Sequence, residues 1–226
     1  MIPSSNGPQA VLELRARVAP WVMEVLSRSA ALGFLGDAPL TEQVDHALGF
    51  VFSAESELGR APRSVVDLGT GGGLPGVVLR SCWPECRLVL LDANQRRTEF
   101  LAGVAGRWKG RGEVEVVRGR AEDTARSPRF RQQSDLVVSR SFGVPAVAVE
   151  CGAPFLSIGG LMVVSEPPDS PPADRWPAAG LAKVGLQAGD RIRLDDRFGY
   201  QVLRKSQPTD DRYPRRVGIP AKRPLF

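Results

Sequence analysis

The segment from Val65 to Gly76 constrains the fold of this chain more than any other part of its sequence. It reads Val-Val-Asp-Leu-Gly-Thr-Gly-Gly-Gly-Leu-Pro-Gly: apolar residues around an acid, then clustered glycines and a proline. The apolar residues predict a strand buried on both faces, and the proline suits the first turn of a helix. Glycines between the two allow a tight turn that lies close against a ligand. The pattern predicts a strand–turn–helix unit whose backbone N–H groups bind a nucleotide-like cofactor.

Strands and helices alternate after this point. Strands are predicted over 64–69, 87–92, 113–117, 135–139 and 160–165, and helices over 75–82, 94–107, 121–126 and 145–156. This alternation predicts a parallel sheet with helices on both faces. The proline-rich residues 166–180 predict a loop. Residues 183–194 and 199–206, with Asp195 and Asp196 between them, predict a closing antiparallel hairpin.

Two helical segments precede the sheet. Residues 9–34 have apolar side chains at helical spacing, and Pro20 is expected to kink or split that helix. Residues 41–58 predict a second helix with Thr41 as its N-cap. We therefore expect an N-terminal helical extension over 1–60, a core over 61–206 and a basic C-terminal tail over 207–226.

The composition indicates the cellular compartment in which this chain works. No apolar run approaches the roughly 20 residues of a membrane helix, and no secretory signal is apparent at the start. The chain has three cysteines, a small and odd number that argues against a disulfide framework and favours a reducing cytosol. Cys82 and Cys86 resemble half of a zinc site, but no second pair completes it, so we expect no metal. These features predict a cytoplasmic protein without a membrane segment.

The net charge is +5, and its placement indicates a partner. Residues 212–226 carry five cations and no acid: Arg212, Arg215, Arg216, Lys222 and Arg223. A second arginine-rich region, 96–131, begins with Arg96 and Arg97. Cations grouped in this way predict contacts with the phosphates of a nucleic acid, although a solvated, solubilising tail is the alternative for 212–226.

Acids near the glycine turn favour one cofactor over another. Asp92 ends the second strand, where a carboxylate can accept hydrogen bonds from ribose hydroxyls. Residues 71–76 fit the G-x-G-x-x-G pattern of nicotinamide enzymes, so an oxidoreductase remains an alternative. A buried charge at Asp67 would repel a pyrophosphate but attract a cationic ligand, and Glu122 follows the third strand, where an adenine amino group could be met. These acids favour S-adenosylmethionine and a class I methyltransferase.

A closer resemblance covers roughly residues 30–226. Asp67 to Gly76, Leu91-Asp92, Gly119-Arg120-Ala121-Glu122, Ser139-Arg140 and the tail motif Tyr213-Pro214-Arg215-Arg216 follow one another in the order seen in the RsmG (GidB) family. The resemblance implies a Rossmann-like, mostly parallel seven-stranded sheet and methylation of N7 of a guanine in 16S ribosomal RNA, on the naked RNA or on the small ribosomal subunit. It implies cofactor contacts at Asp67, Gly69, Gly71, Leu74, Asp92, Ala121, Glu122 and Arg140. Arg140 would lie at the mouth of the site as its catalytic residue.

Two segments depart from the family pattern. Family members usually carry Trp-x-Arg-His where this chain has Gln43-Val44-Asp45-His46, and a Lys-Gly pair where it has Glu166-Pro167. N7 of guanine has a free lone pair, so its methylation needs alignment rather than a general base. A diverged paralogue acting on another RNA or a small molecule, and a non-catalytic RNA-binding protein, remain alternatives. We expect a monomer.

Overall fold

The computed structural model describes residues 7–108, 110–169, 175–194 and 197–226. Its strands are β1 (Ser64–Leu68), β2 (Arg87–Asp92), β3 (Val114–Arg118), β4 (Ser134–Ser139), β5 (Leu156–Glu166), β6 (Leu186–Leu194) and β7 (Phe198–Lys205). Its helices are α1 (Gly7–Arg15), α2 (Pro20–Ala31), α3 (Leu40–Leu58), α4 (Gly76–Cys82), α5 (Gln95–Ala105), α6 (Ala121–Thr124), α7 (Pro145–Gly152), the 3₁₀ turn η1 (Ala153–Phe155), α9 (Ala178–Ala182) and α10 (Ile219–Lys222).

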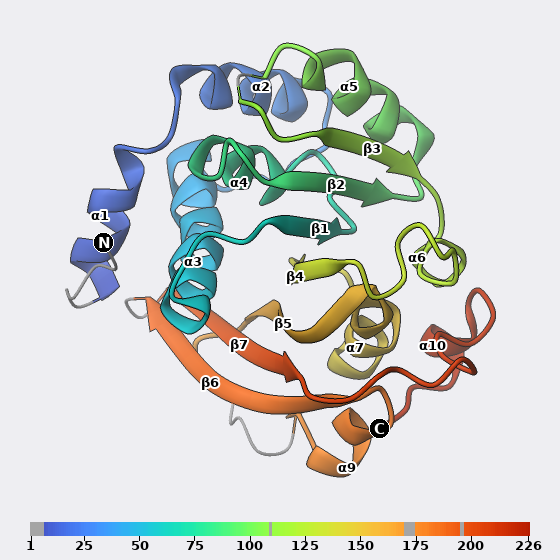
Figure 1. Ribbon diagram of the computed structural model, residues 1–226. Coiled ribbons are helices and arrows are strands. Elements are labelled where there is room, and N and C mark those ends of the chain that lie inside the picture. The colour runs from blue at the N-terminus through green and yellow to red at the C-terminus, as the bar shows by residue number, and fades with distance from the viewer. Residues whose placement is uncertain (1–6, 109, 170–174, 195–196) are drawn as a thin grey trace.

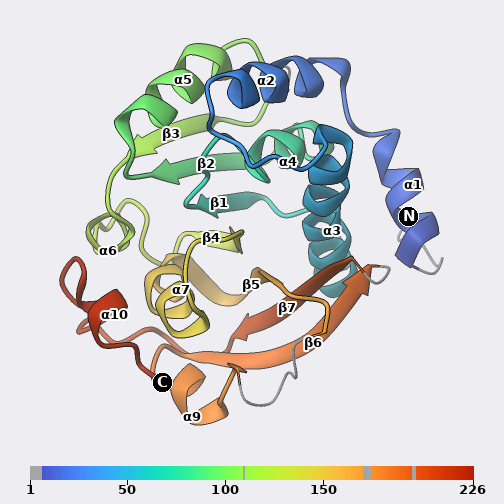
Figure 2. The same ribbon diagram turned by 180° about the vertical axis from the view of Figure 1, so that it is seen from behind.

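The seven strands form one sheet in the order β3-β2-β1-β4-β5-β7-β6 (Figure 1). The first five strands are parallel to one another, whereas β7 runs antiparallel to both β5 and β6. The carboxyl ends of the parallel strands therefore meet along one edge of the sheet, where open α/β folds bind their ligands. The view from behind shows the same continuous sheet from β3 to β6 (Figure 2).

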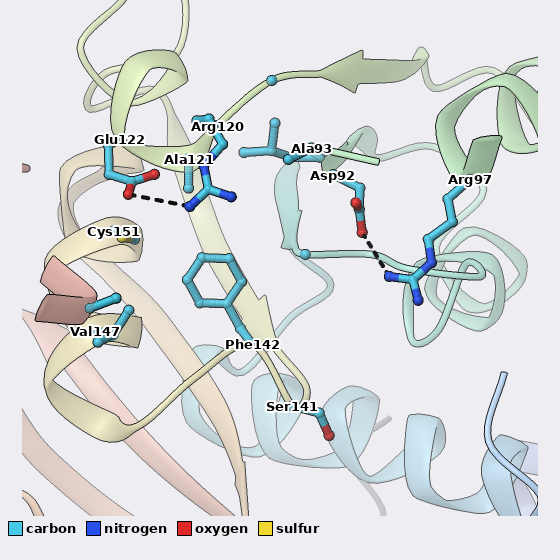
Figure 3. A pocket seen from close by; sticks show the side chains of 14 residues that line it. Asp92, Ala93, Arg97, Arg120, Ala121, Glu122, Ser141, Phe142, Val147 and Cys151 are labelled. Atoms are coloured by element: carbon cyan, nitrogen blue, oxygen red, sulfur yellow. Dashed lines mark ion pairs between the residues drawn. The ribbon is translucent and has the colours of Figure 1, made fainter. Parts of the chain in front are cut away.

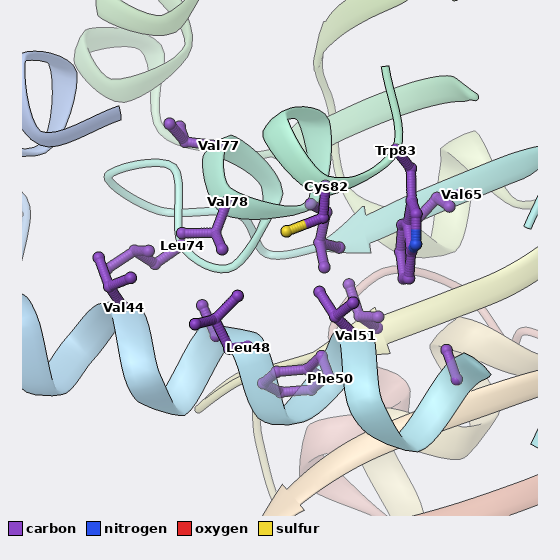
Figure 4. Close-up of a cluster of buried hydrophobic side chains, with 14 of the residues drawn as sticks. Val44, Leu48, Phe50, Val51, Val65, Leu74, Val77, Val78, Cys82 and Trp83 are labelled. Atoms are coloured by element: carbon purple, nitrogen blue, oxygen red, sulfur yellow. The ribbon is translucent and has the colours of Figure 1, made fainter. Parts of the chain in front are cut away.

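Successive side chains of the strands pack on opposite faces of the sheet, as the pleat requires. Val65 belongs to a cluster that the sheet forms with α1 to α5, and Figure 4 shows its centre between α3 and α4. Val66 belongs to a second cluster, formed with α6, α7, η1 and α9. Both faces are thus covered by helices, and the predicted fold class is confirmed.

Helix α3 lies directly against the sheet. Gly49 makes this approach possible, because a Cβ there would lie 2.1 Å from the Tyr200 hydroxyl oxygen of β7. The same hydroxyl donates a hydrogen bond of 2.7 Å to the carbonyl of His46. The N-terminal helices share the core of the sheet in this way, and the division of the chain at residue 60 stays a prediction.

Some predicted boundaries are wrong at the N-terminal side. The split expected at Pro20 is confirmed, because the segment 9–34 contains two helices and Pro20 opens the second, where a missing N–H costs nothing. Thr41 is not the N-cap of α3. That position belongs to Pro39, whose carbonyl accepts from the Gln43 N–H at 3.0 Å to close the first turn.

Later boundaries differ as well. The helix predicted over 145–156 ends at Gly152, because Pro154 lacks the N–H that would continue it, and β5 begins at Leu156. The loop predicted over 166–180 includes the start of α9 at Ala178. Part of that loop, 170–174, and the hairpin turn at 195–196 lie outside the described residues. The flanking strands β6 and β7 confirm the hairpin.

Candidate functional site

Two neighbouring cavities open along the carboxyl edge of the sheet. The first, the glycine-turn cavity, has a volume of about 290 Å³ and is lined by Gly69, Leu91, Asp92, Ala93, Arg97, Gly119, Arg120, Ala121, Glu122, Ser141, Phe142, Val147, Cys151 and Ala221. These residues follow the ends of β1, β2, β3 and β4, with additions from α7 and α10. Figure 3 shows the Phe142 ring between Asp92 on one side and Val147 and Cys151 on the other.

The floor of this cavity is bare backbone at the glycine turn. Gly69 has φ +74°, which disfavours a side chain, and a Cβ there would lie 2.6 Å from Cδ2 of Phe142. The N–H groups of Gly69 and Thr70 both bond the Leu91 carbonyl at 2.9 Å, which ties the turn to the end of β2. The turn therefore brings uncovered backbone beside the Phe142 ring.

Asp92 connects the turn to the next helix. One carboxylate oxygen accepts from the Gly71 N–H at 2.9 Å, and the other accepts from the Asn94 N–H at 2.7 Å. Arg97 lies 3.9 Å away as a weaker ionic partner. A carboxylate has about four lone-pair sites, so both oxygens keep capacity to accept from a diol while holding the turn.

Asp67 lies beneath the turn and does not line the cavity. Its Oδ2 accepts from the Thr70 hydroxyl at 2.7 Å and from the Gly76 N–H at 2.8 Å. Its Oδ1 is buried without a hydrogen-bond partner. Burial raises the pKa of the Asp67 carboxyl to about 6. A buried anion with an unused oxygen fits a site that takes a cationic ligand.

Arg140 extends from the end of β4 toward α3. Its Nη2 donates to Gln43 Oε1 at 3.3 Å, while its Nη1 and the Ser139 hydroxyl are buried without partners. Burial lowers the pKa of Arg140. Burial, and next the charge of Arg140, lower the pKa of His46 to about 3, so that imidazole is neutral at physiological pH. Three buried polar atoms at the ends of β1 and β4, counting Asp67 Oδ1, therefore lack protein partners and fit a polar ligand.

The C-terminal segment forms part of the cavity wall. Glu122 accepts from the Gly218 N–H at 2.9 Å, and Ala221 of α10 lines the cavity. The segment is fixed by Arg215, whose guanidinium makes two bonds of 2.8 and 2.7 Å to the fully buried carboxylate of Glu150 on α7. Residues 207–226 are thus a docked element of the site.

The second cavity, the β5 cavity, has a volume of about 310 Å³. Its lining residues are His46, Ser139, Ser141, Phe142, Gly143, Pro145, Val164, Ser165, Glu166, Pro167, Pro168, Arg175 and Arg197. Ser141 and Phe142 line both cavities and so form the wall between them. His46 stacks on Phe198 with ring centroids 4.8 Å apart. This arrangement places two ligand-sized spaces on either side of one aromatic ring.

Half of the predicted cofactor residues line the glycine-turn cavity: Gly69, Asp92, Ala121 and Glu122. The others, Asp67, Gly71, Leu74 and Arg140, lie around it, and Leu74 is buried in the cluster shared with α3. The sequence reasoning missed Ser141, Phe142, Val147 and Ala221. The first two directly follow the fourth strand, at the edge where ligands were expected, and that position was the available signal.

The predicted RNA-binding cations fall into two groups. Arg96 is exposed on α5 with its guanidinium carbon 5.6 Å from the Phe34 ring centroid, and Arg97 lines the glycine-turn cavity. Arg212, Arg216, Lys222 and Arg223 are exposed on the tail. Arg215 differs from these, because its charge is engaged by Glu150.

The family model described as "rRNA small subunit methyltransferase G" matches residues 37–166. The ribosomal RNA small subunit methyltransferase G of Clostridium kluyveri is 34% identical over 166 residues, which is 72% of this chain and 70% of the relative. The chain belongs to the rRNA small subunit methyltransferase G family. The enzyme of the same name from Alkaliphilus oremlandii is 31% identical and covers 80% of this chain and 78% of its own length.

A solved structure supports the fold. Cofactor-bound Rv0187 from MTB matches with a TM-score of 0.60 and 21% identity, covering 91% of this chain and all of that one. Family and fold confirm the predictions of the RsmG family, a class I methyltransferase and S-adenosylmethionine as its cofactor. The oxidoreductase alternative loses its support, because dinucleotide-binding sheets have the order 3-2-1-4-5-6 without an inserted antiparallel strand.

Two features are absent from the described residues. None of their helices has the length and apolar character needed to cross a bilayer. They contain no group of three or more His, Cys, Asp or Glu side chains placed to hold a metal ion. Cys82 and Cys86 are buried thiols, and burial raises the pKa of each to about 12.

Proposed function

We propose that this enzyme methylates N7 of a guanine in 16S ribosomal RNA, with S-adenosylmethionine in the glycine-turn cavity and the guanine in the β5 cavity. The observation that carries the proposal is the shared wall of Ser141 and Phe142. Two spaces that share one thin wall allow a methyl donor and an acceptor base to meet at a single point. The family's name supports ribosomal RNA of the small subunit as the substrate.

The cofactor would be held by groups that the turn already orients. Asp92 would accept from the ribose hydroxyls, and Ala121 and Glu122 would border the adenine. Asp67 and Arg140 would face the methionine end, where their unpartnered atoms lie. The cofactor supplies a sulfonium-bound methyl group. The buried charge of Asp67 would favour that cation over its neutral demethylated product.

The acceptor side needs alignment and no proton transfer before methylation. N7 attacks through its own lone pair, so the protein must orient the base, exclude water and stabilise the shift of positive charge toward the purine. The neutral imidazole of His46 and the ring of Phe142 would border the base. Arg140, between Asp67 and His46, would act from below the wall as the predicted catalytic residue. It would donate to an acceptor atom there through its unpartnered Nη1.

The RNA around the target base would be held by exposed cations on both sides of the cavities. Arg96 and Arg97 lie at the start of α5, and Arg212, Arg216, Lys222 and Arg223 lie on the tail. Phosphate contacts of this kind position an RNA without reading its sequence. The base would be splayed out of its stack into the β5 cavity. We place the reaction in the cytoplasm, where ribosomal subunits assemble, with the enzyme acting as a monomer.

The decisive experiment is methyl transfer from labelled S-adenosylmethionine to unmodified small ribosomal subunits and to naked 16S RNA, followed by mapping of the labelled nucleotide. We expect one N7-methylguanine in 16S RNA. No label in either substrate, under conditions where another family member is active, would overturn the proposal. Sedimentation of the enzyme alone tests the monomer.

A second candidate is a methyltransferase of the same family that acts on another RNA or a small molecule. The observation that favours it is Glu166, which stands in the β5 cavity where the family usually carries Lys-Gly. The same labelling experiment, extended to total RNA and to a small-molecule extract, separates the two candidates.

A further inference from the structure

Glu166 is the only carboxylate among the described residues that line the β5 cavity. It is the last residue of β5, so its side chain stands at the carboxyl edge of the sheet, next to the end of β4. Only 4% of that side chain is exposed. A carboxylate this deeply buried is rare in proteins unless its charge is engaged.

Arg175 engages the charge and fixes the direction of the carboxylate. Its Nε donates to Oε2 at 2.6 Å and its Nη2 donates to Oε1 at 3.2 Å. Because each oxygen has two lone pairs, the bidentate pair leaves one acceptor site on each oxygen. The two remaining lone pairs point to opposite sides of the carboxylate, so one of them can accept from a ligand in the cavity, which Arg197, His46, Phe142 and hydroxyl-bearing side chains also line.

We propose that Glu166 determines the base specificity of the reaction by accepting a hydrogen bond from the N2 amine of the acceptor guanine. This inference rests on the proposed function and assigns its specificity to one side chain. Guanine carries this amine at C2, whereas adenine and the base of inosine have only hydrogen there. N7 belongs to the opposite, five-membered ring of the purine. A base anchored at Glu166 therefore directs N7 toward the wall of Ser141 and Phe142, behind which the cofactor lies.

The same contact strengthens during the reaction. Methyl transfer forms a bond between N7 and the methyl carbon and breaks the bond between that carbon and sulfur. The purine gains the positive charge that the sulfonium loses, and no proton moves. Hydrogen bonds from a purine cation to a carboxylate are stronger than those from a neutral purine. Glu166 therefore stabilises the transition state more than the ground state, which raises kcat as well as binding.

The test separates this role from a purely structural Glu166–Arg175 pair. Small subunits are reconstituted with 16S RNA that carries either guanosine or inosine at the mapped target, inosine lacking only the N2 amine. The values of kcat/KM are measured for the wild type and for Glu166→Gln. The wild type should prefer guanosine by about 10- to 100-fold, the contribution of one hydrogen bond to a charged group. In Glu166→Gln the preference should fall to about threefold or less, because a neutral amide gains little from the amine.

Two controls complete the design. Glu57→Gln breaks another Glu–Arg pair, with Arg204 at 3.0 Å, that lines neither cavity, and it should keep the wild-type preference. Arg175→Gln removes the ion-pair partner of Glu166 but keeps the carboxylate that accepts from the base, so this variant too should retain a preference for guanosine. Cofactor binding by calorimetry verifies that each variant is folded.

The outcomes are distinct. If Glu166→Gln slows both substrates equally and keeps the preference, or if the wild type does not distinguish inosine from guanosine, the inference is wrong. The wild-type comparison decides this even if Glu166→Gln does not fold. If the wild type methylates no guanosine substrate at all, the proposed function itself fails.

Discussion

The glycine-turn cavity and the β5 cavity share a wall but differ in how their polar groups are bonded. In the glycine-turn cavity, the carboxylates accept their hydrogen bonds from backbone N–H groups, and arginines are only more distant ionic partners, at 3.7 to 3.9 Å. Asp92 accepts from Gly71 and Asn94, and Glu122 accepts from Gly218. In the β5 cavity, the carboxylate of Glu166 binds a side chain, Arg175. Backbone donors are fixed by the fold, whereas a side-chain partner can be exchanged without changing it.

This difference suits a common cofactor and a particular substrate. A cavity whose acids also hold the backbone cannot change without disturbing the fold, and under the proposed function it would bind the cofactor that every member of the family needs. A cavity built from a replaceable ion pair can alter its recognition of the acceptor base. We therefore expect variants of the first cavity to affect folding and cofactor together, and variants of the second to affect substrate choice alone.

The largest effect should follow from removing the bond that docks the tail onto the first cavity. Arg215→Ala leaves the buried Glu150 carboxylate without its cation, and the loss of one partner of such a pair costs about 3–5 kcal/mol. We expect this decrease in the free energy of unfolding in urea. Because Glu122 and Ala221 meet at the docked tail, cofactor affinity should fall as well.

Arg204→Ala is the matched control for Arg215→Ala. It breaks the more exposed pair with Glu57 and should cost about 1 kcal/mol or less. A loss at Arg215 no larger than that at Arg204 would contradict the structural role of the tail.

The next effect concerns the cofactor directly. Asp92→Ala removes the proposed acceptor for the ribose and also releases the N–H groups of Gly71 and Asn94. We expect S-adenosylmethionine affinity to fall by about 100-fold, since two hydrogen bonds to a charged group are lost. Calorimetry measures this effect. Asp190→Ala, an exposed acid on β6, should leave the affinity unchanged; equal affinities in the two variants would exclude Asp92 from the site.

The same difference between the cavities explains what the sequence could predict. Gly69, Asp92, Ala121 and Glu122 each lie at or just after the end of a strand, so a local pattern placed them at the carboxyl edge of the sheet, and the structure brings them together. The β5 cavity joins His46 of α3 to Glu166 and to Arg175, more than a hundred residues later. No local periodicity predicts that meeting, because it depends on how α3 packs on β7.

The tail shows a second limit of sequence reasoning. Counting charge treated Arg215 and Arg216 alike, although one is engaged by a buried carboxylate and the other is exposed. The distinction depends on Glu150, an acid in an otherwise apolar helix 65 positions away along the chain. A buried carboxylate at Glu150 requires a cationic partner, but the sequence does not indicate which of the five cations in residues 212–226 supplies it.

A smaller effect should separate the exposed cations of the tail from the docked one. The triple variant Arg216→Gln, Lys222→Gln and Arg223→Gln should weaken RNA binding by about tenfold at moderate salt. The slope of the logarithm of the RNA-binding constant against the logarithm of salt concentration should fall by the equivalent of up to about three phosphate contacts. Its stability and cofactor affinity should stay those of the wild type. Arg63→Gln, at the opposite edge of the sheet, is the control. An unchanged salt dependence in the triple variant would favour the solubilising tail over the RNA contact.

The smallest effect tests the charge beneath the glycine turn. Burial raises the pKa of Asp67 to about 6, so the carboxylate is ionised above that pH and increasingly neutral below it. As the pH falls through 6, the site loses a negative charge, and S-adenosylmethionine should lose affinity by about three- to tenfold relative to the neutral S-adenosylhomocysteine. Calorimetry with both ligands across this range gives the ratio. In Asp67→Asn the ratio should stay constant with pH. A pH-dependent ratio that persists in Asp67→Asn would assign the charge to another group and would remove Asp67 from the description of the cofactor site.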